Sequence, residues 1–356
     1  MGAEDPRGRE DMAVGCAVIS SAVVGGRMAG MDGVADGVAE ATEATEVAEV
    51  ANPAPAVVDA AVDRSRLTVV VNPKAGGGRA AKVLDDVRAA LDRWADDVSV
   101  ETTRSLEHAD ELARAAVADG RVTVALGGDG LSGRVAGAVA RAGGVLAILP
   151  GGRGNDFARG LGIPRDPALA ATALVAAVER RVDLPEANGV PFLGIASLGF
   201  DSDVQVIANR TTWLSGQSVY TYAVMRALAA WKPARFTVTI DDEAPREHAG
   251  WTVGAANAAY YGGGMKFAPD ADIADGLLEI VLVARTGRLT FLRLFPRIFS
   301  GRHVEVPYVQ VSRARRLVVD ADRPFQVYAD GDPVADLPAE IVVRPGALRL
   351  LVPPQP

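Results

Sequence analysis

The chain has 356 residues, 49% of them hydrophobic and 23% charged, which suits two domains with ordinary hydrophobic cores. Its single cysteine, Cys16, excludes a disulfide framework within the chain, and its three histidines lie in no Cys/His cluster, which argues against a zinc site. The formal net charge of -8 comes from residues 1–65, which hold twelve of the 45 acidic residues and four of the 37 basic residues. The rest of the chain is therefore neutral. It lacks the surplus of basic residues that is typical of a nucleic-acid-binding protein.

Residues 1–65 form the first predicted segment, a disordered low-complexity extension. They are rich in Ala, Val, Gly and Glu and contain almost no aromatic residues. The mildly apolar stretch MAVGCAVISSAVVGG is too short to span a bilayer, and acidic rather than basic residues precede it, so a signal peptide is disfavoured. The methionines at 28 and 31 leave open a later start codon.

Residues 66–181 alternate between strand and helix patterns, which predicts an α/β domain with a parallel sheet covered on both faces. The predicted strands end in glycine-rich or Asn-Pro turns, and the predicted helices show apolar residues at helical spacing. The strand patterns are RLTVVVNP, VSVETT, RVTVALGGDG and VLAILPGG, and the helix patterns are GRAAKVLDDVRAALDRWA, EHADELARAAVADG, LSGRVAGAVARAGG and DPALAATALVAAVERR.

Residues 182–336 change to short strands, which predicts an antiparallel β domain of the sandwich type, with helices near 214–230 and 288–299. The last segment, 337–356, has a strand pattern that we expect to return to the first domain. An interdomain cleft would then separate the two halves.

Three glycine-rich turns follow strands of the first domain: NPKAGGGR (72–79), GGDG (127–130) and PGGRGND (150–156). In an open parallel sheet, ligands bind beyond the carboxyl ends of the strands. Glycine allows backbone N–H groups to approach a phosphate, and a following helix N-terminus favours negative charge. One such turn is ordinary, but three at one sheet edge predict a triphosphate or dinucleotide pocket. Neither a P-loop nor a dinucleotide fingerprint is present.

The ordered set VNPKAGGGR, GGDG, PGGRGNDFARGLGIP, YYGGGMKFAPDADIADGLLEIV and YADGD resembles the diacylglycerol kinase catalytic-domain family, which includes bacterial lipid kinases, sphingosine kinases and ceramide kinases. The resemblance runs from about residue 67 to 352. It implies an ATP-binding α/β domain, a β-rich lipid-binding domain and transfer of the γ-phosphoryl group of MgATP to a lipid hydroxyl, with diacylglycerol as the leading substrate and phosphatidic acid as its product.

The resemblance also implies roles for individual residues. Asp129, Asp183 and Asp332 match the acidic positions, with Asp332 as the expected general base and Asp129 its rival, because phosphoryl transfer needs acids near Mg²⁺ and the reacting hydroxyl. Asp275 and the carbonyl group of Leu277 match a structural Mg²⁺ site. The expected ATP contacts are Asn72, Pro73, Lys74, Gly76, Gly77, Gly78, Arg79, Thr103, Gly127, Gly128, Gly130, Gly152, Arg153, Gly154, Asn155 and Asp156.

Each acid has a plain structural interpretation beside the functional one. Asp330-Gly331 is typical of a hairpin turn, Asp183 of a linker, and Asp275 of a turn before Gly276. The chain also departs from the family pattern: the usual GGDGT-x-N-E reads GGDGLSGR, so Arg134 replaces an acid, and the usual P-x-G-T-x-N-D reads PGGRGND, so Arg153 enters the pocket. These arginines could strengthen phosphate binding or mark a changed donor or reduced activity.

A lipid substrate requires contact with a membrane surface, and no segment is long enough to span one. Residues 287–302 combine large apolar residues with four arginines, so this stretch either lies in the membrane interface or covers the core with a solvated basic face, and the second interpretation is favoured. We expect a cytoplasmic protein, peripheral at the inner membrane face, that binds no nucleic acid; a homodimer stays open. The alternatives are a sphingosine- or ceramide-type kinase, a soluble-substrate kinase such as an NAD kinase, and a lipid- or nucleotide-binding relative with reduced catalysis.

Overall fold

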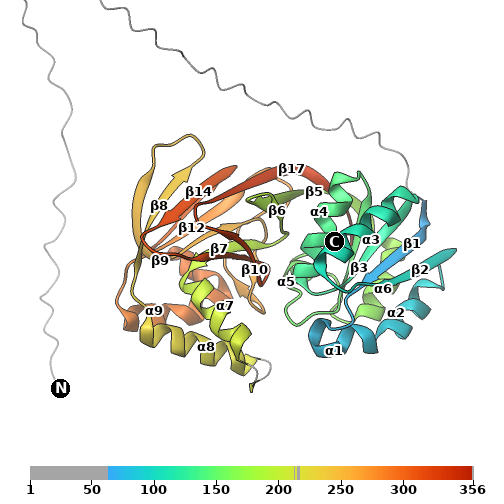
Figure 1. The fold of residues 1–356 in the computed structure, drawn as a ribbon, viewed down its shortest axis with the longest axis horizontal. Coiled ribbons are helices and arrows are strands. Elements are labelled where there is room, and N and C mark those ends of the chain that lie inside the picture. Colours follow the sequence, from blue (N-terminus) through green and yellow to red (C-terminus); the bar gives the residue numbers. More distant parts are fainter. Residues whose placement is uncertain (1–62, 212, 215–216, 355–356) are drawn as a thin grey trace, which may run out of the picture. The chain divides into compact units, whose positions relative to one another are not determined.

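The computed structural model describes residues 63–211, 213–214 and 217–354. The predicted extension therefore lies outside the described residues, except for 63–65, which already belong to the first strand. Figure 1 shows the α/β part and the β-rich part of the chain. The α helices are α1 (Ala75–Lys82), α2 (Leu84–Leu91), α3 (Leu106–Ala118), α4 (Asp129–Arg141), α5 (Asp156–Gly160), α6 (Pro167–Ala173), α7 (Phe200–Arg210), α8 (Gln217–Ala230) and α9 (Arg288–Leu294).

The strands form one continuous mixed sheet, apart from a separate small ribbon of β10 and β11. The strands are β1 (Asp63–Val71), β2 (Asp97–Thr102), β3 (Arg121–Gly127), β4 (Val145–Pro150), β5 (Val178–Ala187), β6 (Val190–Pro191), β7 (Ile195–Gly199), β8 (Ala234–Ile240), β9 (Arg246–Ala256), β10 (Tyr260–Tyr261), β11 (Met265–Lys266), β12 (Leu278–Ala284), β13 (Val309–Ala314), β14 (Arg316–Ala321), β15 (Gln326–Ala329), β16 (Asp332–Asp336) and β17 (Ala339–Val352).

The α/β domain has the parallel sheet predicted from the sequence. Its strand order is β2-β1-β3-β4, and all three pairings are parallel. Helices α3 and α4 pack on one face, whereas α1, α2 and α6 cover the other, as Figure 1 shows. Strands β1, β3 and β4 are buried runs of Val, Leu, Ile and Ala because helices cover both of their faces.

Strand β17 joins the parallel and the antiparallel parts of the sheet. Its first half pairs antiparallel with β14 of the β-rich domain, and its second half pairs parallel with β4, with Leu350 opposite Leu146. Strand β5 runs antiparallel along nearly all of β17, and the register shifts between Arg344 and Leu348. The end of the chain therefore completes the parallel sheet, and the bulge lies where β17 passes from one domain to the other.

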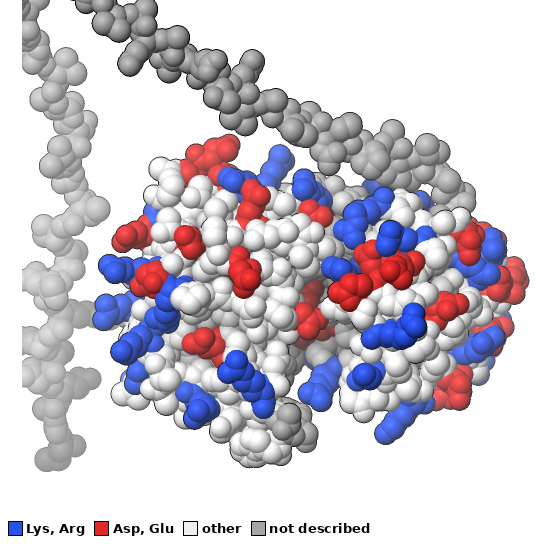
Figure 2. Space-filling view, viewed as in Figure 1, with Lys and Arg blue, Asp and Glu red and all other residues white. Residues whose placement is uncertain are grey.

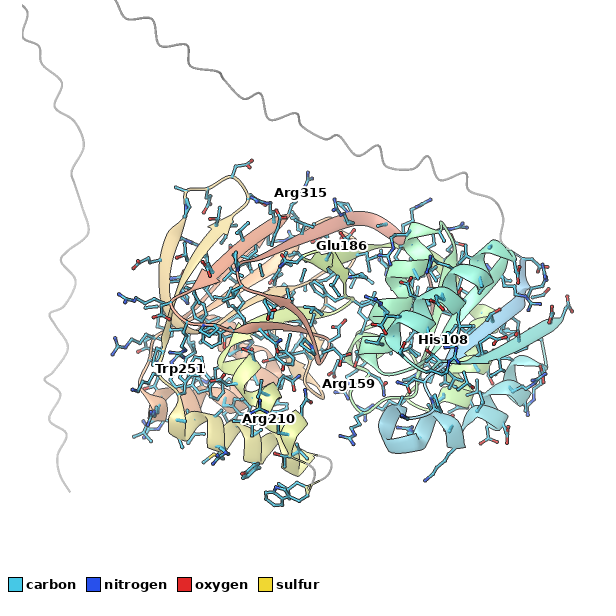
Figure 3. All side chains as sticks on the ribbon, in the orientation of Figure 1. His108, Arg159, Glu186, Arg210, Trp251 and Arg315 are labelled. Carbon is cyan, nitrogen blue, oxygen red and sulfur yellow. The ribbon has the colours of Figure 1, made fainter. Side chains whose placement is uncertain are left out.

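The β-rich domain is antiparallel, with β9 paired to β7, β8 and β12. Its core is aromatic: Trp251 on β9 stacks on Phe291 of α9 with ring centroids 4.1 Å apart and meets Phe200 of α7 edge to face at 5.6 Å. Figure 3 labels Trp251 in the β-rich part of the chain. Aromatic pairs of this kind add to the free energy gained from burying their area.

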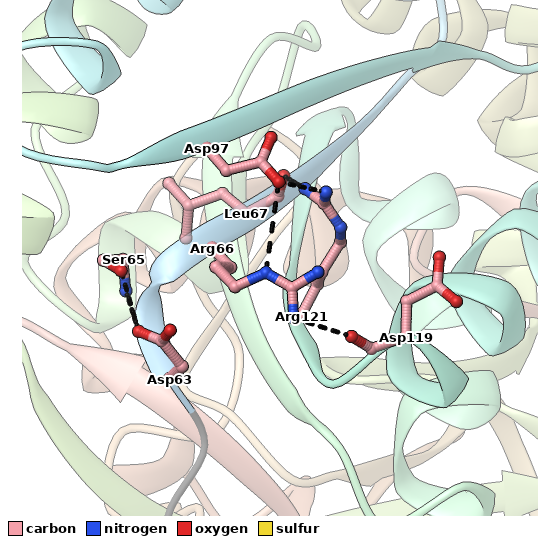
Figure 4. A network of polar contacts seen from close by, with 7 residues as sticks. All are labelled: Asp63, Ser65, Arg66, Leu67, Asp97, Asp119 and Arg121. Carbon is pink, nitrogen blue, oxygen red and sulfur yellow. Dashed lines mark hydrogen bonds and ion pairs between the residues drawn. The ribbon is translucent and has the colours of Figure 1, made fainter.

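Charged side chains of both signs are interspersed over the face of the molecule that Figure 2 presents. Figure 4 shows a network of charged residues at the N-terminal end of β1. In this network, Asp97 forms ion pairs with Arg66 and Arg121. Arg121 also donates to the carbonyl of Leu67 at 3.1 Å, and Arg66 donates to that of Asp119. These contacts tie β1, β2 and β3 together at the edge opposite the glycine-rich turns.

Four local predictions differ from the structure. The helix expected over 78–95 is broken at Val83 into α1 and α2. The helix expected over 166–181 ends earlier, at Ala173, with a 3₁₀ turn to Ala176, because residues from Val178 onward pair with β17 instead. Helix α7 was not predicted, since its sequence continues a strand-like run. The helix expected over 288–299 stops at Leu294 and continues as a 3₁₀ helix, Phe295–Ser300, because Pro296 cannot donate a backbone hydrogen bond.

Candidate active site

The three glycine-rich turns converge at the carboxyl ends of β1, β3 and β4. The N–H of Gly151 donates to the carbonyl of Gly127 at 2.8 Å, and a Cβ atom on Gly76 would lie only 2.6 Å from the Gly151 carbonyl oxygen. A Cβ on Gly152 would likewise overlap Gly128. The backbones of the three turns therefore touch, and larger residues at these positions would separate them.

The first turn is a run of left-handed backbone rather than a regular helix. Gly76, Gly77 and Gly78 have φ angles of 61°, 71° and 89°, a region that side-chain-bearing residues adopt only with strain. Asn72 supports the start of the turn, because its side-chain oxygen accepts the N–H of Lys74 at 3.0 Å. Successive backbone N–H groups in such turns create anion-binding concavities. The positive φ angles of the three glycines can form a concavity of this kind.

Asp129 opens helix α4 directly behind the second turn. Its two carboxylate oxygens accept the backbone N–H groups of Asp156 and Phe157 at 3.1 and 3.2 Å, which fastens the second turn to the third. Desolvation and then the charge of Asp156 raise the pKa of Asp129 to about 6, although these hydrogen bonds act in the opposite direction. A carboxylate in this condition can hold a proton at neutral pH more readily than an exposed acid.

Asp156 opens helix α5 and reaches across to the β-rich domain. One of its oxygens accepts the N–H of Gly263 at 2.7 Å, and the other is buried without a hydrogen-bond partner among the described residues. Burial raises its pKa. The neighbouring Arg159 of α5, labelled in Figure 3, packs against Gly264, where any Cβ would collide with its guanidinium group. The glycines at 262–264 therefore let the two domains approach closely at the site.

The terminal hairpin β15–β16 brings Asp332 to the same place. Asp330 and Gly331 have φ angles of 53° and 92°, as a tight two-residue hairpin turn requires, so the hairpin interpretation of the sequence agrees with the structure. The Asp332 carboxylate lies against Gly130, and a Cβ on Gly130 would overlap it. Partial burial raises the pKa of Asp332, while the residue stays in contact with solvent.

Asp330 is the site residue that the sequence analysis did not assign. Its carboxylate accepts the backbone N–H groups of Leu193, Gly194 and Ile195 at 2.7 to 3.3 Å. Desolvation and then the charge of Asp129 raise its pKa to about 7. Because backbone amides already occupy its oxygens, Asp330 fixes the hairpin in front of β7. The turn motif alone could have suggested this role, since Asp in such turns often binds backbone amides.

Asp183 has a different environment from the one expected for a catalytic acid. It is buried on β5, and its two oxygens accept the N–H groups of Gly276 and Gly346, both at 2.7 Å. Gly346 lies in the bulge of β17. In the part of the chain that the structure describes, the Asp183 carboxylate thus binds the strand that links the domains rather than Asp129 or Asp332.

The predicted metal site at Asp275 and Leu277 does not fit Mg²⁺. Asp275 forms an ion pair with Arg313, and its other oxygen accepts the N–H of Leu277 at 2.9 Å in a local turn. A carboxylate already engaged by a guanidinium is a poor ligand for a dication. Among residues 63–354, as far as they are described, no three His, Cys, Asp or Glu side chains are grouped to hold a metal ion.

The other predicted ATP contacts surround the turns. Thr103 is buried and its hydroxyl donates to the carbonyl of Ser105 at 2.6 Å, which shapes the loop before α3. Arg79 donates to the carbonyl of Arg165, and both Lys74 and Arg153 are exposed at the rim. Asn155 exchanges two hydrogen bonds with Gly152 and closes the third turn. No contact in the structure tests the ATP contact predicted for Pro73.

This architecture is that of a two-domain kinase: glycine turns at the carboxyl edge of a parallel sheet face a carboxylate delivered by a β-rich second domain. Residues 66–187 match the diacylglycerol kinase catalytic domain, and residues 194–352 match the YegS C-terminal NAD kinase beta sandwich-like domain. The chain therefore belongs to the diacylglycerol kinase catalytic-domain family and is a lipid kinase, which agrees with the fold and the enzyme class predicted from the sequence.

Relatives in several bacteria carry matching names. The chain is 36% identical over 295 residues to a diacylglycerol kinase of Mycobacterium tuberculosis, covering 81% of this chain and 95% of that protein. It is 33% identical over 301 residues to a probable lipid kinase YegS-like of Pseudomonas aeruginosa, covering 82% and 96%. In fold, it is similar to the crystal structure of a putative diacylglycerol kinase from Bacillus anthracis, with a TM-score of 0.70, 24% identity and coverage of 83% and 98%.

Proposed function

We propose that this chain transfers the γ-phosphoryl group of MgATP to the hydroxyl group of diacylglycerol and forms phosphatidic acid. One observation carries this proposal: the Asp332 carboxylate lies against Gly130 of the turn that also presents Asp129. A hydroxyl group beside Asp332 would then stand next to the loops that are shaped to hold the triphosphate. The names of the relatives support diacylglycerol over other lipid alcohols.

The reaction follows from these positions. The acceptor oxygen forms a bond to the γ-phosphorus as the bond from that phosphorus to the β,γ-bridging oxygen breaks, and the acceptor proton passes to Asp332. The N–H groups of the glycine turns and the N-terminus of α4 stabilise the negative charge of the phosphates. Mg²⁺ would arrive with the nucleotide as part of the substrate and would neutralise phosphate charge. Asp129, which accepts two backbone N–H groups, is the carboxylate that would hold it.

A transfer assay with labelled γ-phosphate tests the proposal. The protein, MgATP and mixed micelles of diacylglycerol, ceramide, sphingosine or no lipid are incubated in parallel, and NAD in buffer serves as the soluble acceptor. We expect label in phosphatidic acid, with a rate at least tenfold above every other acceptor. Label in a sphingolipid or in NADP instead would refute the substrate assignment, and no label in any arm would refute the donor.

We also propose that the protein meets its substrate as a peripheral protein on a membrane surface. The structure describes no helix that is long and apolar enough to cross a membrane. Leu289 is 71% exposed and Trp213 is 70% exposed, and Phe299 and Met225 are also exposed. Arg288 donates to the carbonyl of Trp231, just after α8, so the start of α9 lies beside the end of α8. Exposed apolar side chains beside exposed arginines suit an anionic membrane surface.

A further inference from the structure

A cavity of about 220 Å³ opens beside Asp332, between the N-terminal ends of α3 and α4, strand β6 and the β15–β16 turn. We call it the α3–α4 cavity. Gly130, Gly133 and Arg134 of α4 form one wall, and Asp330 and Asp332 form another. It adjoins the phosphate loops at Gly130 but extends away from them along α4.

Arg134 has no partner in this cavity. Its side chain is half-buried, and its Nε is sealed from solvent without a hydrogen-bond acceptor in the described chain. Within the same described residues it forms no ion pair; Glu107 of α3 is close enough to sense its charge but does not reach it. By contrast, Arg141 on the same helix forms an ion pair with Asp110 at 3.0 Å. Arg134 is thus an unpaired cation on a cavity wall.

The physical cost of this arrangement indicates a ligand. Burying the Nε–H group of Arg134 without an acceptor has a free-energy cost, which a leucine at the same place would avoid. The planar guanidinium group binds phosphate oxygens through two parallel N–H bonds. On the facing wall, backbone amides saturate Asp330, but no side chain or amide of the described residues binds Asp332. The cavity therefore has the N–H donors of the Arg134 guanidinium group on one side and the carboxylate of Asp332 on the other.

We propose that the α3–α4 cavity binds a ligand that carries both a phosphate group, held by Arg134, and a hydroxyl group, held by Asp332. This inference rests on the proposed function, because it assigns the specificity of the same site. Two participants in the reaction have this chemistry. One is an acceptor lipid whose head group is itself a phosphate ester with a free hydroxyl, which Asp332 would deprotonate. The other is the nucleotide, whose ribose hydroxyl would then occupy Asp332 in place of the acceptor. Arg134 is then a specificity-determining residue of the kinase.

The experiment compares R134Q, which removes the charge, with R134K, which keeps the charge but not the guanidinium group, and with R141Q as a matched control on the same helix. Calorimetry first measures the Kd of MgATP and MgADP without lipid. Transfer assays then measure kcat/KM with diacylglycerol and with phosphatidylglycerol, which carries the phosphate and the hydroxyl group. Thermal unfolding of each variant shows that the fold is retained.

If the nucleotide is the ligand, R134Q raises the Kd of MgATP by about tenfold or more, R134K by less, and R141Q not at all. If the lipid is the ligand, nucleotide binding is unchanged, and R134Q lowers kcat/KM by about tenfold for phosphatidylglycerol but not for diacylglycerol. Unchanged values in both arms for R134Q would overturn the inference. The binding arm does not depend on turnover. If the wild type is inactive on every lipid, the proposed function is refuted, and an unchanged Kd of MgATP for R134Q then overturns this inference as well.

Discussion

The carboxylate of Asp332 lies against Gly130, although the two residues are far apart in the sequence and come from different domains. This contact places the acid of the terminal hairpin at the first turn of α4, one residue from Asp129. A kinase of this family needs such an arrangement, since phosphoryl transfer depends mostly on position and charge. The pairing of β15 with β16 and the hydrogen bond from the Gly194 N–H to Asp330 hold the hairpin in place. The fold itself therefore fixes the contact.

Substitution of Gly130 by alanine tests this contact. The added methyl group would overlap the Asp332 carboxylate, which can swing away because it ends a flexible side chain. We therefore expect the melting temperature to change little and kcat to fall by about a hundredfold, because a displaced base loses its alignment. Gly287→Ala is the control: its Cβ would meet only Thr290 Oγ1 at 3.9 Å. Equal activity of both variants would argue against a reacting role for Asp332.

Asp332 itself is tested by its pH profile. Desolvation raises the pKa of Asp332, and a general base works only when deprotonated, so kcat/KM of the wild type should rise with pH and level off above that raised pKa. Asp332→Asn should lower kcat by about 10²- to 10⁴-fold and abolish this acid limb while sparing nucleotide binding. Asp332→Glu, which keeps a carboxylate at this position, should retain the limb. A limb that persisted in the Asn variant would assign the proton transfer to another acid, with Asp129 first.

The sequence predicted the parts of this site that depend on local backbone chemistry. Strand runs that end in glycine turns predict loops at one sheet edge, and Gly76 and Gly152 adopt the close approaches that such residues permit. The roles of Asp183 and Asp330 depend instead on which amides the tertiary structure brings to them, and Gly346 and Leu193 are far from them in sequence. The same holds for Arg134, whose lack of a partner is visible only once α3 and the hairpin are in place.

Variants of Asp183 distinguish a structural role of this residue from a catalytic one. Its buried carboxylate accepts the N–H groups of Gly276 and Gly346. Asp183→Ala would leave both amides without an acceptor, so we expect the free energy of unfolding to fall by about 2–5 kcal/mol. Asp183→Asn keeps one acceptor and should lose about half of that. Chemical denaturation measures both values. In the Asn variant, kcat per folded molecule should stay within about tenfold of the wild type, and a much larger loss with an intact fold would restore the catalytic role predicted from the sequence.

The buried acids predict how stability depends on pH. The pKa of Asp129 is raised to about 6 and that of Asp330 to about 7, whereas both are near 3.8 in the unfolded chain. Between about pH 4 and pH 7 the folded protein therefore holds protons that the unfolded chain has released, so the free energy of unfolding falls as pH rises. Asp129→Asn removes one of these groups, and its melting temperature relative to the wild type should increase from pH 5 to pH 8. The exposed Asp242→Asn should show a constant difference, and a constant difference for Asp129→Asn too would contradict the raised pKa.

The face formed by α8 and α9 predicts where the protein meets a membrane. Phe291 of α9 points into the core and stacks on Trp251, whereas Leu289 and Phe299 point outward beside Arg293 and Arg297. The helix therefore covers the core with one side, as the favoured sequence interpretation expected, and still presents an apolar, basic outer side.

The double variant Leu289→Gln/Phe299→Gln leaves the buried contact intact. It should reduce co-sedimentation with vesicles of phosphatidylglycerol and phosphatidylcholine by about tenfold, because about 2 kcal/mol or more of apolar burial is lost. Arg293→Gln/Arg297→Gln should weaken binding mainly at low salt, whereas the distant pair Leu169→Gln/Val175→Gln, also exposed, serves as the control. If the control weakens sedimentation as much as the α9 variant does, this face is not the membrane contact.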